Sequence, residues 1–304
     1  MESSPEGVSS AHLGEHYSTL LPNQRGAAAH STLRQLSNGG IGNGTTQQQV
    51  PGPRHEQPSI NEALDVFEKQ YAAGQAKSLS GIAGRAFLLG ITLALAGTTT
   101  IWLLWRGETG LWRAPCFVAL LALFHFLEFL TTAHYNTPAA TITSFLLSSN
   151  GSAYTGAHTA ALCECLLSYT FNLPNTSSLP LPLPLSLVGI LLVVVGQAIR
   201  TIAMCQAGTN FNHVVQHRRN PTHRLVTDGI YAVLRHPSYF GFFWWGIGTQ
   251  LVLGNVVCLL GYAAVLWKFF HARIQGEEEL LCNFFGDEYT SYKKRTWVGI
   301  PLCG

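Results

Sequence analysis

The chain has 304 residues, a formal net charge of +2 at pH 7 and a hydrophobic fraction of 47%. Charged residues make up only 11% of it, whereas a soluble globular protein contains roughly 25%. The nearly neutral charge, without a basic stretch interleaved with aromatic residues, excludes an electrostatic argument for nucleic-acid binding, and the scarcity of charge favours a membrane protein.

The N-terminal quarter differs from the rest of the chain. Residues 1–57 are rich in Gly, Ser, Gln and His and lack a periodic apolar pattern, so we predict a disordered tail. Residues 58–75 follow as a short amphipathic helix, in which Ser59 and Glu62 match a capping box and Leu64 and Phe67 share one face. We expect this helix to lie on the membrane or on the catalytic region.

Residues 82–204 are predicted to hold four transmembrane helices. The stretch 86–105 contains no charged residue, and its length matches one crossing of a hydrocarbon core about 30 Å thick. Further apolar stretches cover 114–135, 152–171 and 185–199. A Leu-Pro alternation at 179–185 predicts an extended loop before the last of them.

A second uncharged region runs from 237 to 267, too long for one straight crossing and too short for two full ones. The Gly254-Asn255 turn in its middle predicts a helical hairpin of 237–253 and 256–271, followed by a polar tail from Arg273. The fold class is therefore all-α, a multi-spanning membrane protein with about six transmembrane helices. A polar loop and the tail would flank the hairpin.

Cationic segments predict how the chain is oriented in the membrane. The loop 205–236 carries four arginines and four histidines, and the tail contains Lys293-Lys294-Arg295. The positive-inside rule places both segments in the cytosol, and counting back over four spans places the N-terminus there too, although the short loop between Arg106 and Arg113 weighs against it. Residues 205–304 would then form one catalytic region, because polar groups that border a membrane hairpin tend to line a site.

Several blocks in this region match a known family. The loop reads Arg235-His-Pro-Ser-Tyr-Phe-Gly241, and the tail reads Glu277-Glu-Glu-Leu-Leu281 and then Phe285-Gly-Asp-Glu-Tyr289. With the Arg200-Thr-Ile-Ala-Met204 block, the chain resembles isoprenylcysteine carboxyl methyltransferases, closely over 185–301 and loosely before that. As a set these blocks are specific, whereas any one alone would be weak.

This resemblance implies an S-adenosylmethionine-dependent enzyme of the endoplasmic reticulum membrane, with its site facing the cytosol. Its substrates would be the C-terminal carboxylates of farnesylated or geranylgeranylated cysteines in processed CaaX proteins, such as small GTPases. Arg200 and Arg273 would face the methyl acceptor. The cofactor would contact Gln216, His223, Arg224, Leu225, Val226, Tyr231, His236, Pro237, Ser238, Tyr239 and Glu277.

The expected reaction needs few catalytic groups. A C-terminal carboxylate has a pKa near 3.5 and is already ionised at neutral pH, so no general base, metal or covalent nucleophile is expected. In-line positioning and exclusion of water would suffice. Arginine suits the positioning because its fork holds a carboxylate at two points and keeps its charge. We therefore predict that both arginines orient the carboxylate rather than activate it.

Some residues carry a simpler interpretation beside the functional one. His213 and His217 have a zinc-compatible spacing, but solvated loop histidines or histidines hydrogen-bonded within a helical turn are favoured. Glu278 and Glu279 are expected to be solvated, unlike Glu277. Arg200 could merely anchor the end of a span at the lipid headgroups.

Polar and aromatic residues inside the spans also allow a structural interpretation. His125 and Glu128 lie one turn apart, and a hydrogen bond between helices is slightly favoured over a functional role. The cysteines show no paired spacing, and the Cys163-Glu-Cys165 triplet is interpreted as small buried thiols rather than a metal site. Aromatic residues 242–245 are assigned to packing and the membrane interface.

Two further classes of function compete with the carboxyl methyltransferase: a different enzyme with a similar membrane core, and a membrane protein without catalytic activity. Sterol reductases have a similar C-terminal region but bind a nicotinamide cofactor, and phospholipid N-methyltransferases are similar around the cofactor loop. The combination of Arg200, Arg273 and Glu277 favours the carboxyl methyltransferase. A membrane scaffold or transporter without catalytic activity would leave the polar blocks on both sides of the hairpin unexplained.

Overall fold

The computed structural model describes residues 60–176, 184–219, 221 and 223–303. These residues form α-helices joined by loops and short 3-10 turns, and their only β-type pairing is an isolated parallel bridge between Leu234 and Trp297. The all-α prediction is confirmed. The predicted tail 1–57, the capping residue Ser59 and most of the predicted Leu-Pro loop lie outside the described residues.

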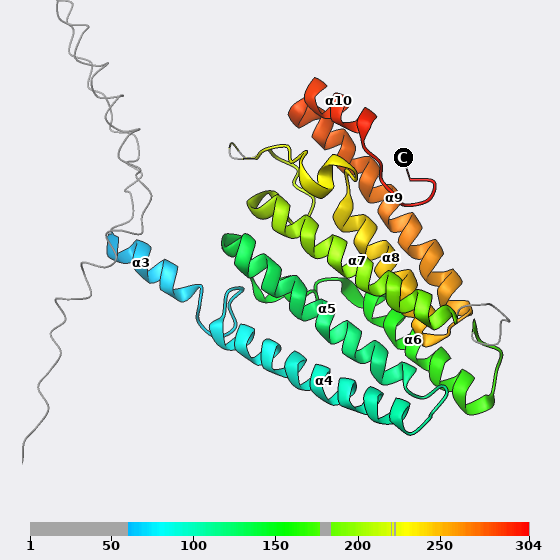
Figure 1. Cartoon of the computed structure of the whole chain (residues 1–304). Helices are drawn as coiled ribbons and strands as arrows, with labels where there is room; N and C mark the ends of the chain where they lie inside the picture. Colours follow the sequence, from blue (N-terminus) through cyan, green and yellow to red (C-terminus); the bar gives the residue numbers. More distant parts are fainter. Residues whose placement is uncertain (1–59, 177–183, 220, 222, 304) are drawn as a thin grey trace, which may run out of the picture. The chain divides into compact units, whose positions relative to one another are not determined.

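Six long helices lie side by side, and the segment between α7 and α8 meets α10 at one end of them (Figure 1). Leu234, in that segment, bridges to Trp297 just after α10. The described part of the chain contains eight α-helices in all, which are α3 (Ile60–Lys69), α4 (Leu79–Trp105), α5 (Arg113–Tyr135), α6 (Gly151–Phe171), α7 (Leu185–Ala207), α8 (Pro237–Leu253), α9 (Val257–Phe285) and α10 (Asp287–Arg295).

Among the described helices, four are long and apolar enough to cross a membrane: α4, α5, α7 and α9. Helix α8 has only 17 residues, and α6 is less apolar because it carries His158, Glu164 and several hydroxyl side chains. The six helices α4–α9 correspond in place to the six that the sequence predicts. That all six cross the bilayer stays a prediction.

The largest difference from the prediction concerns α9. The sequence predicts a helix end at His271, but α9 continues to Phe285 and carries Arg273 and Glu277 on its last turns. The predicted start of the polar tail at Arg273 is therefore wrong. Leu, Glu and Gln are good helix formers and a lone glycine at 276 costs only about 1 kcal/mol, so nothing there stops the helix. It ends at Gly286, whose φ is +55°.

Helices α7 and α8 come closest to one another because glycines face each other across the contact. A Cβ built on Gly196 would lie 2.6 Å from the carbonyl oxygen of Gly241, closer than real Cβ atoms come. A second such pair is formed by Gly189 and Gly248. This close approach places Arg200, one turn beyond Gly196, beside the start of α8.

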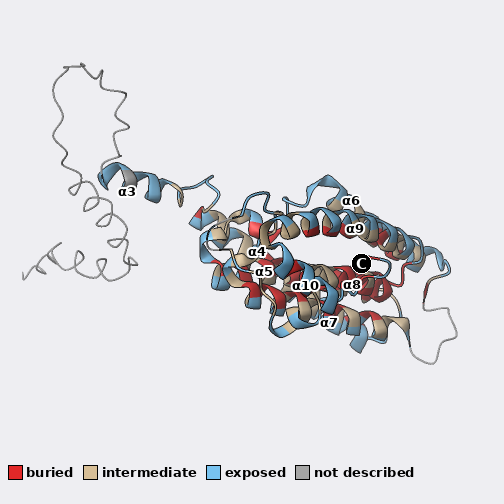
Figure 2. Ribbon diagram, turned by 90° about the horizontal axis from the view of Figure 1, so that it is seen from above, coloured by how far each residue is buried: buried red, intermediate tan, exposed pale blue. Residues whose placement is uncertain are grey.

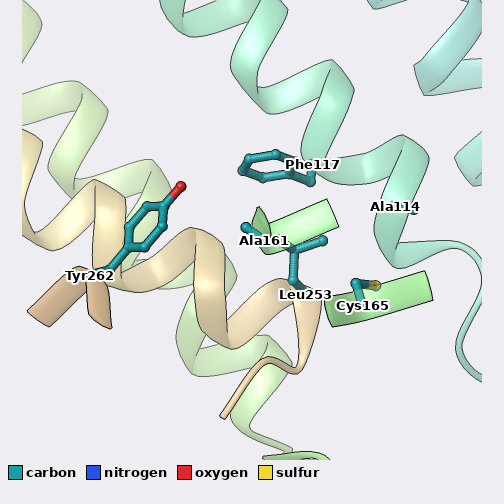
Figure 3. Packing of buried hydrophobic residues seen from close by; sticks show 6 residues of the cluster. All are labelled: Ala114, Phe117, Ala161, Cys165, Leu253 and Tyr262. Atoms are coloured by element: carbon teal, nitrogen blue, oxygen red, sulfur yellow. The ribbon is translucent and has the colours of Figure 1, made fainter. Parts of the chain in front are cut away.

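Helices α5, α6, α8 and α9 share a hydrophobic core. Buried residues face one another between the helices, whereas many apolar side chains on the outer surface are exposed (Figure 2). This pattern is expected where lipid, not water, is the surrounding solvent. One core cluster (Figure 3) contains Ala114, Phe117, Ala161, Cys165, Leu253 and Tyr262.

The Cys163-Glu-Cys165 triplet of α6 holds the hairpin turn. The carboxylate of Glu164 accepts hydrogen bonds of 2.7–2.8 Å from the three backbone N–H groups of residues 256–258, which begin α9. Free N–H groups at a helix N-terminus favour such an anionic partner. Cys165 is buried as predicted, whereas Cys163 is exposed, so the buried-thiol interpretation is wrong for Cys163.

Candidate active site

The predicted cofactor residues come together in one pocket. All eleven, from Gln216 in the loop to Glu277 on α9, line it. The loop between α7 and α8, the first turn of α8 and the last turns of α9 form its walls. Neither Arg200 nor Arg273 lines the pocket, but each contacts a residue that does.

Hydrogen bonds fix the loop that forms one wall. The backbone N–H of Arg224 donates to the side-chain oxygen of Asn210 at 3.0 Å. Tyr231 donates its hydroxyl to the carbonyl of Ala203 at 3.2 Å, and Tyr292 of α10 donates to the carbonyl of Tyr231 at 2.7 Å. Burial raises the pKa of Tyr292 to about 12 and also raises the pKa of Tyr231, so both phenols stay neutral donors at physiological pH.

A hydrogen-bonded chain runs from α9 into the pocket. Arg273 Nε donates to the hydroxyl of Tyr239 at 2.9 Å, and this hydroxyl donates to Glu277 Oε2 at 2.5 Å. Arg273 Nη2 also donates to the carbonyl of His213 at 2.6 Å. Arg273 and Glu277 lie one turn apart on α9, so the continuous helix aligns both with the pocket.

Arg200 is buried and its guanidinium is already bound. Nε and Nη2 donate to the two carboxylate oxygens of Glu128 at 2.5 and 2.7 Å, and Nη1 donates to Ser238 Oγ at 2.8 Å. Glu128 is 1% exposed and is also 3.0 Å from His213 Nε2. The interhelical interpretation of Glu128 is confirmed, whereas the expectation that His213 is solvated is wrong.

His125, one turn before Glu128, serves packing in the structure. Its Nδ1 lies 2.7 Å from the carbonyl oxygen of Phe145, and its Nε2 lies 3.3 Å from the hydroxyl of Tyr154 on α6. These contacts confirm a hydrogen bond between helices at His125. His217 in the loop is exposed, as predicted.

Glu278 is the centre of an ion cluster beside the pocket. It is buried, and its carboxylate lies 2.6 Å from Arg235 Nε, 3.2 Å from His236 Nε2 and 2.5 Å from Lys293 Nζ. The predicted solvation of Glu278 is therefore wrong, and that of its neighbour Glu279, which is exposed, is confirmed. The cluster ties α9 and α10 to the residues that enter α8.

Comparison with known proteins assigns the chain to a family. The model of the "Isoprenylcysteine carboxyl methyltransferase (ICMT) family" matches residues 188–283. The "Protein-S-isoprenylcysteine O-methyltransferase" of Saccharomyces cerevisiae is 47% identical over 189 residues, which cover 61% of this chain and 78% of that protein. The chain belongs to the isoprenylcysteine carboxyl methyltransferase family.

Further relatives support this membership. The human protein of the same name is 44% identical over 186 residues, which cover 61% of this chain and 64% of that protein. A solved structure of a "eukaryotic intramembrane Ras methyltransferase ICMT" is 31% identical and has a TM-score of 0.66, covering 81% of this chain and 88% of that one. The family assignment makes the chain a methyltransferase and removes the sterol reductase and the scaffold as candidate functions.

The pocket has an apolar wall that the sequence prediction missed. Four residues of α9 form this wall, and they follow Glu277 at intervals of one and two helical turns, so their side chains project from one side of the helix. Their i, i+4 spacing would have indicated them if α9 had been predicted to continue past His271. They are Leu280, Leu281, Phe284 and Phe285.

Two polar atoms of residues that line the pocket, His223 Nδ1 and the Tyr289 hydroxyl, lack a hydrogen-bond partner within the described part of the chain. Both atoms are buried, and a buried polar atom is costly unless a ligand or water satisfies it. Together with the Glu277 carboxylate and the apolar wall of α9, they suit a ligand that has both polar and aromatic parts.

The described residues contain no group of three or more His, Cys, Asp or Glu side chains placed to hold a metal ion. His213, the nearest such candidate in the sequence, is bound to Glu128 instead. A metal-free reaction stays a prediction.

Proposed function

We propose that this methyltransferase esterifies the C-terminal carboxylate of a farnesylated or geranylgeranylated cysteine in processed CaaX proteins, small GTPases among them. The relatives' name supports the prenylcysteine substrate. The observation that carries the proposal is the single pocket that gathers eleven residues from the loop, α8 and α9. We place the enzyme in the endoplasmic reticulum membrane with this pocket at the cytosolic face.

The pocket residues fit S-adenosylmethionine, which would supply a methyl group on a positively charged sulfur. The Glu277 carboxylate can accept hydrogen bonds from ribose hydroxyls or from the ammonium group. The unpaired His223 Nδ1 offers a further polar contact. Leu225 and Tyr231 form part of a wall that suits an adenine ring. In this role the chain binds and orients its donor and supplies no covalent nucleophile of its own.

Arg273 is the better placed of the two arginines to bind the acceptor carboxylate. It is only partly buried and forms no ion pair with any described residue. Its Nε and Nη2 now donate to neutral oxygens of Tyr239 and His213, so a carboxylate that replaced one of them would gain a charged partner.

Arg200 acts on the pocket indirectly, through its contact with Ser238. The carboxylate of Glu128 already binds one edge of the Arg200 guanidinium and neutralises most of its charge. The remaining Nη1 group of Arg200 donates to Ser238 in the pocket wall. Both arginines then position the acceptor, and neither removes a proton. The carboxylate is ionised without their help.

A membrane site suits this pair of substrates. Burial of a prenyl chain in lipid is favourable by about 0.8 kcal/mol per CH₂ group, so a lateral approach from the bilayer avoids extracting the chain into water. The charged donor must come from the aqueous side. A pocket between the loop and the ends of α8 and α9 lies where both can reach it.

The direct test is methyl transfer from labelled S-adenosylmethionine to N-acetyl-S-farnesylcysteine. We expect base-labile label in the product with this acceptor and none with the non-prenylated analogue. Protection of the purified protein from thermal unfolding by S-adenosylmethionine, but not by a nicotinamide cofactor, would identify the donor independently. Equal labelling of both acceptors would refute the prenylcysteine specificity.

A further inference from the structure

A second concave surface lies beside the proposed catalytic pocket. It is formed by α10 and the C-terminal segment 296–303, here called the C-terminal groove, and has a volume of about 870 Å³. Arg235 borders both the pocket and this groove. No residue predicted or proposed to act in catalysis lines the C-terminal groove, so it needs an explanation of its own.

The C-terminal groove is cationic. Among the described residues, Arg235, Lys293 and Lys294 line it, and no aspartate or glutamate does. Arg235 and Lys293 share the single carboxylate of Glu278. Lys294 is exposed and forms no ion pair with a described residue. The groove therefore keeps a positive charge that an anion can neutralise.

Apolar side chains accompany this charge. Trp297, which lines the groove, is 75% exposed, and Leu302 in the same segment is 88% exposed. Large apolar side chains held this far out of the protein are costly in water, whereas tryptophan beside lysine is typical of a membrane–water interface. The exposed surface fits contact with lipid better than contact with an aqueous ligand.

Two indole groups support the view that the segment faces lipid. Trp267 Nε1 donates to the carbonyl of Pro301 at 2.9 Å, and Trp244 Nε1 donates to the carbonyl of Gly299 at 3.3 Å. Lipid chains offer no donor to the carbonyls of a non-helical segment, so the protein has to supply one. Both donors come from α8 and α9, the membrane hairpin itself.

From these observations we propose that the C-terminal groove binds the headgroup of an anionic phospholipid, with Lys294 at the phosphate and Trp297 beside the glycerol and acyl region. A soluble acidic peptide or free phosphate would match the charge but would leave Trp297 and Leu302 without an apolar partner. The proposal goes beyond methyl transfer and does not depend on it.

Brominated lipids, which quench tryptophan on contact, provide the test. The full chain in micelles of a neutral detergent is titrated with brominated phosphatidylserine or brominated phosphatidylcholine. The signal of Trp297 is the difference between the chain and its Trp297→Phe variant. We expect half-maximal quenching of this component at a lower mole fraction of phosphatidylserine than of phosphatidylcholine.

A matched pair of variants locates the charge. Lys294→Gln should raise the phosphatidylserine fraction at half-quenching about fivefold, which corresponds to about 1 kcal/mol for one cation near an anionic headgroup. Lys69→Gln makes the same chemical change at an exposed lysine of α3 and should have no effect. Equal quenching by the two lipids, or equal effects of the two variants, would overturn the proposal. So would displacement of the lipid by soluble glycerophosphoserine at a similar concentration.

Discussion

At the scale of single residues, two buried carboxylates organise the site. Glu128 binds Arg200 and His213, and Glu278 binds Arg235, His236 and Lys293. Each carboxylate joins segments that are distant in the sequence, and both of its oxygens have partners. Buried charges of this kind are stable only when they are paired, so the partners depend on one another.

Removing the charge of Glu278 should therefore affect both stability and the pocket. In Glu278→Gln, Arg235 and Lys293 would lose their carboxylate partner, and we expect a loss of about 3 kcal/mol of unfolding free energy. His236 would also lose its carboxylate partner, so the KM for S-adenosylmethionine should rise. Thermal unfolding and donor-saturation kinetics measure the two effects. The exposed neighbour gives the control, because Glu279→Gln should change neither quantity.

The two arginines should respond differently to replacement by lysine. Arg273→Lys keeps a charge but loses the fork, and we expect kcat/KM for the prenylcysteine acceptor to fall about tenfold or more with little change in stability. Arg200→Lys should instead lower the unfolding midpoint, because one ammonium cannot bond both oxygens of Glu128 and also Ser238. Unchanged methylation by both variants would remove the arginines from the proposed site.

At the scale of elements, the contact between α7 and α8 aligns the site. Gly196 on α7 meets the backbone of Gly241 on α8, and a side chain on either would collide with main-chain atoms of the other helix. Arg200 follows Gly196 by four residues, and Ser238 precedes Gly241 by three. The backbone approach therefore brings Arg200 Nη1 within 2.8 Å of Ser238 Oγ.

A single methyl group tests this alignment. Gly196→Ala would place its Cβ 2.6 Å from the carbonyl oxygen of Gly241, and overpacking of this kind typically costs about 1–3 kcal/mol. We expect lower thermal stability and a lower kcat as α8 shifts away from Arg200. Gly97→Ala on α4, where no atom lies within 4 Å of the added Cβ, is the matched control and should be neutral or slightly stabilising. Identical behaviour of the two variants would contradict the argument.

At the scale of the whole molecule, the proposed function requires the loop after α7 and the segment after α9 to be on one side of the membrane. The structure brings them together, because Arg219 of the loop donates to the carbonyl of Phe284 in the last turn of α9 at 2.6 Å, and Leu234 bridges to Trp297 after α10. A helical hairpin returns the chain to the face from which it started, so α8 and α9 satisfy this requirement.

Labelling in sealed microsomes tests the sidedness. His217→Cys and Lys294→Cys should each react with a membrane-impermeant thiol reagent from outside, the cytosolic face, above the background of the parent chain. Glu108→Cys, between α4 and α5, should react only after the membrane is permeabilised. Labelling of positions 217 and 294 from opposite faces would make a shared pocket impossible.

The pocket was predictable because its residues lie in compact blocks that resemble one family. All eleven predicted cofactor residues line it. The error at α9 has a local cause, since a charged stretch that follows an apolar span in the sequence suggests the end of a helix. A membrane boundary changes the surroundings of a helix but does not end it, and α9 continues because its residues still favour helix.

By itself the sequence determined the helical architecture, the hairpin turn and the polar blocks around it, because apolar periodicity, glycine turns and motifs are local properties of the chain. Only the tertiary structure decided which charges are paired. Glu128 and Arg200 are 72 residues apart, and Glu278 and Arg235 are 43 apart. No periodicity links such residues, since their pairing depends on how whole helices pack. For this reason Glu278 looked solvated in the sequence and is buried in the fold.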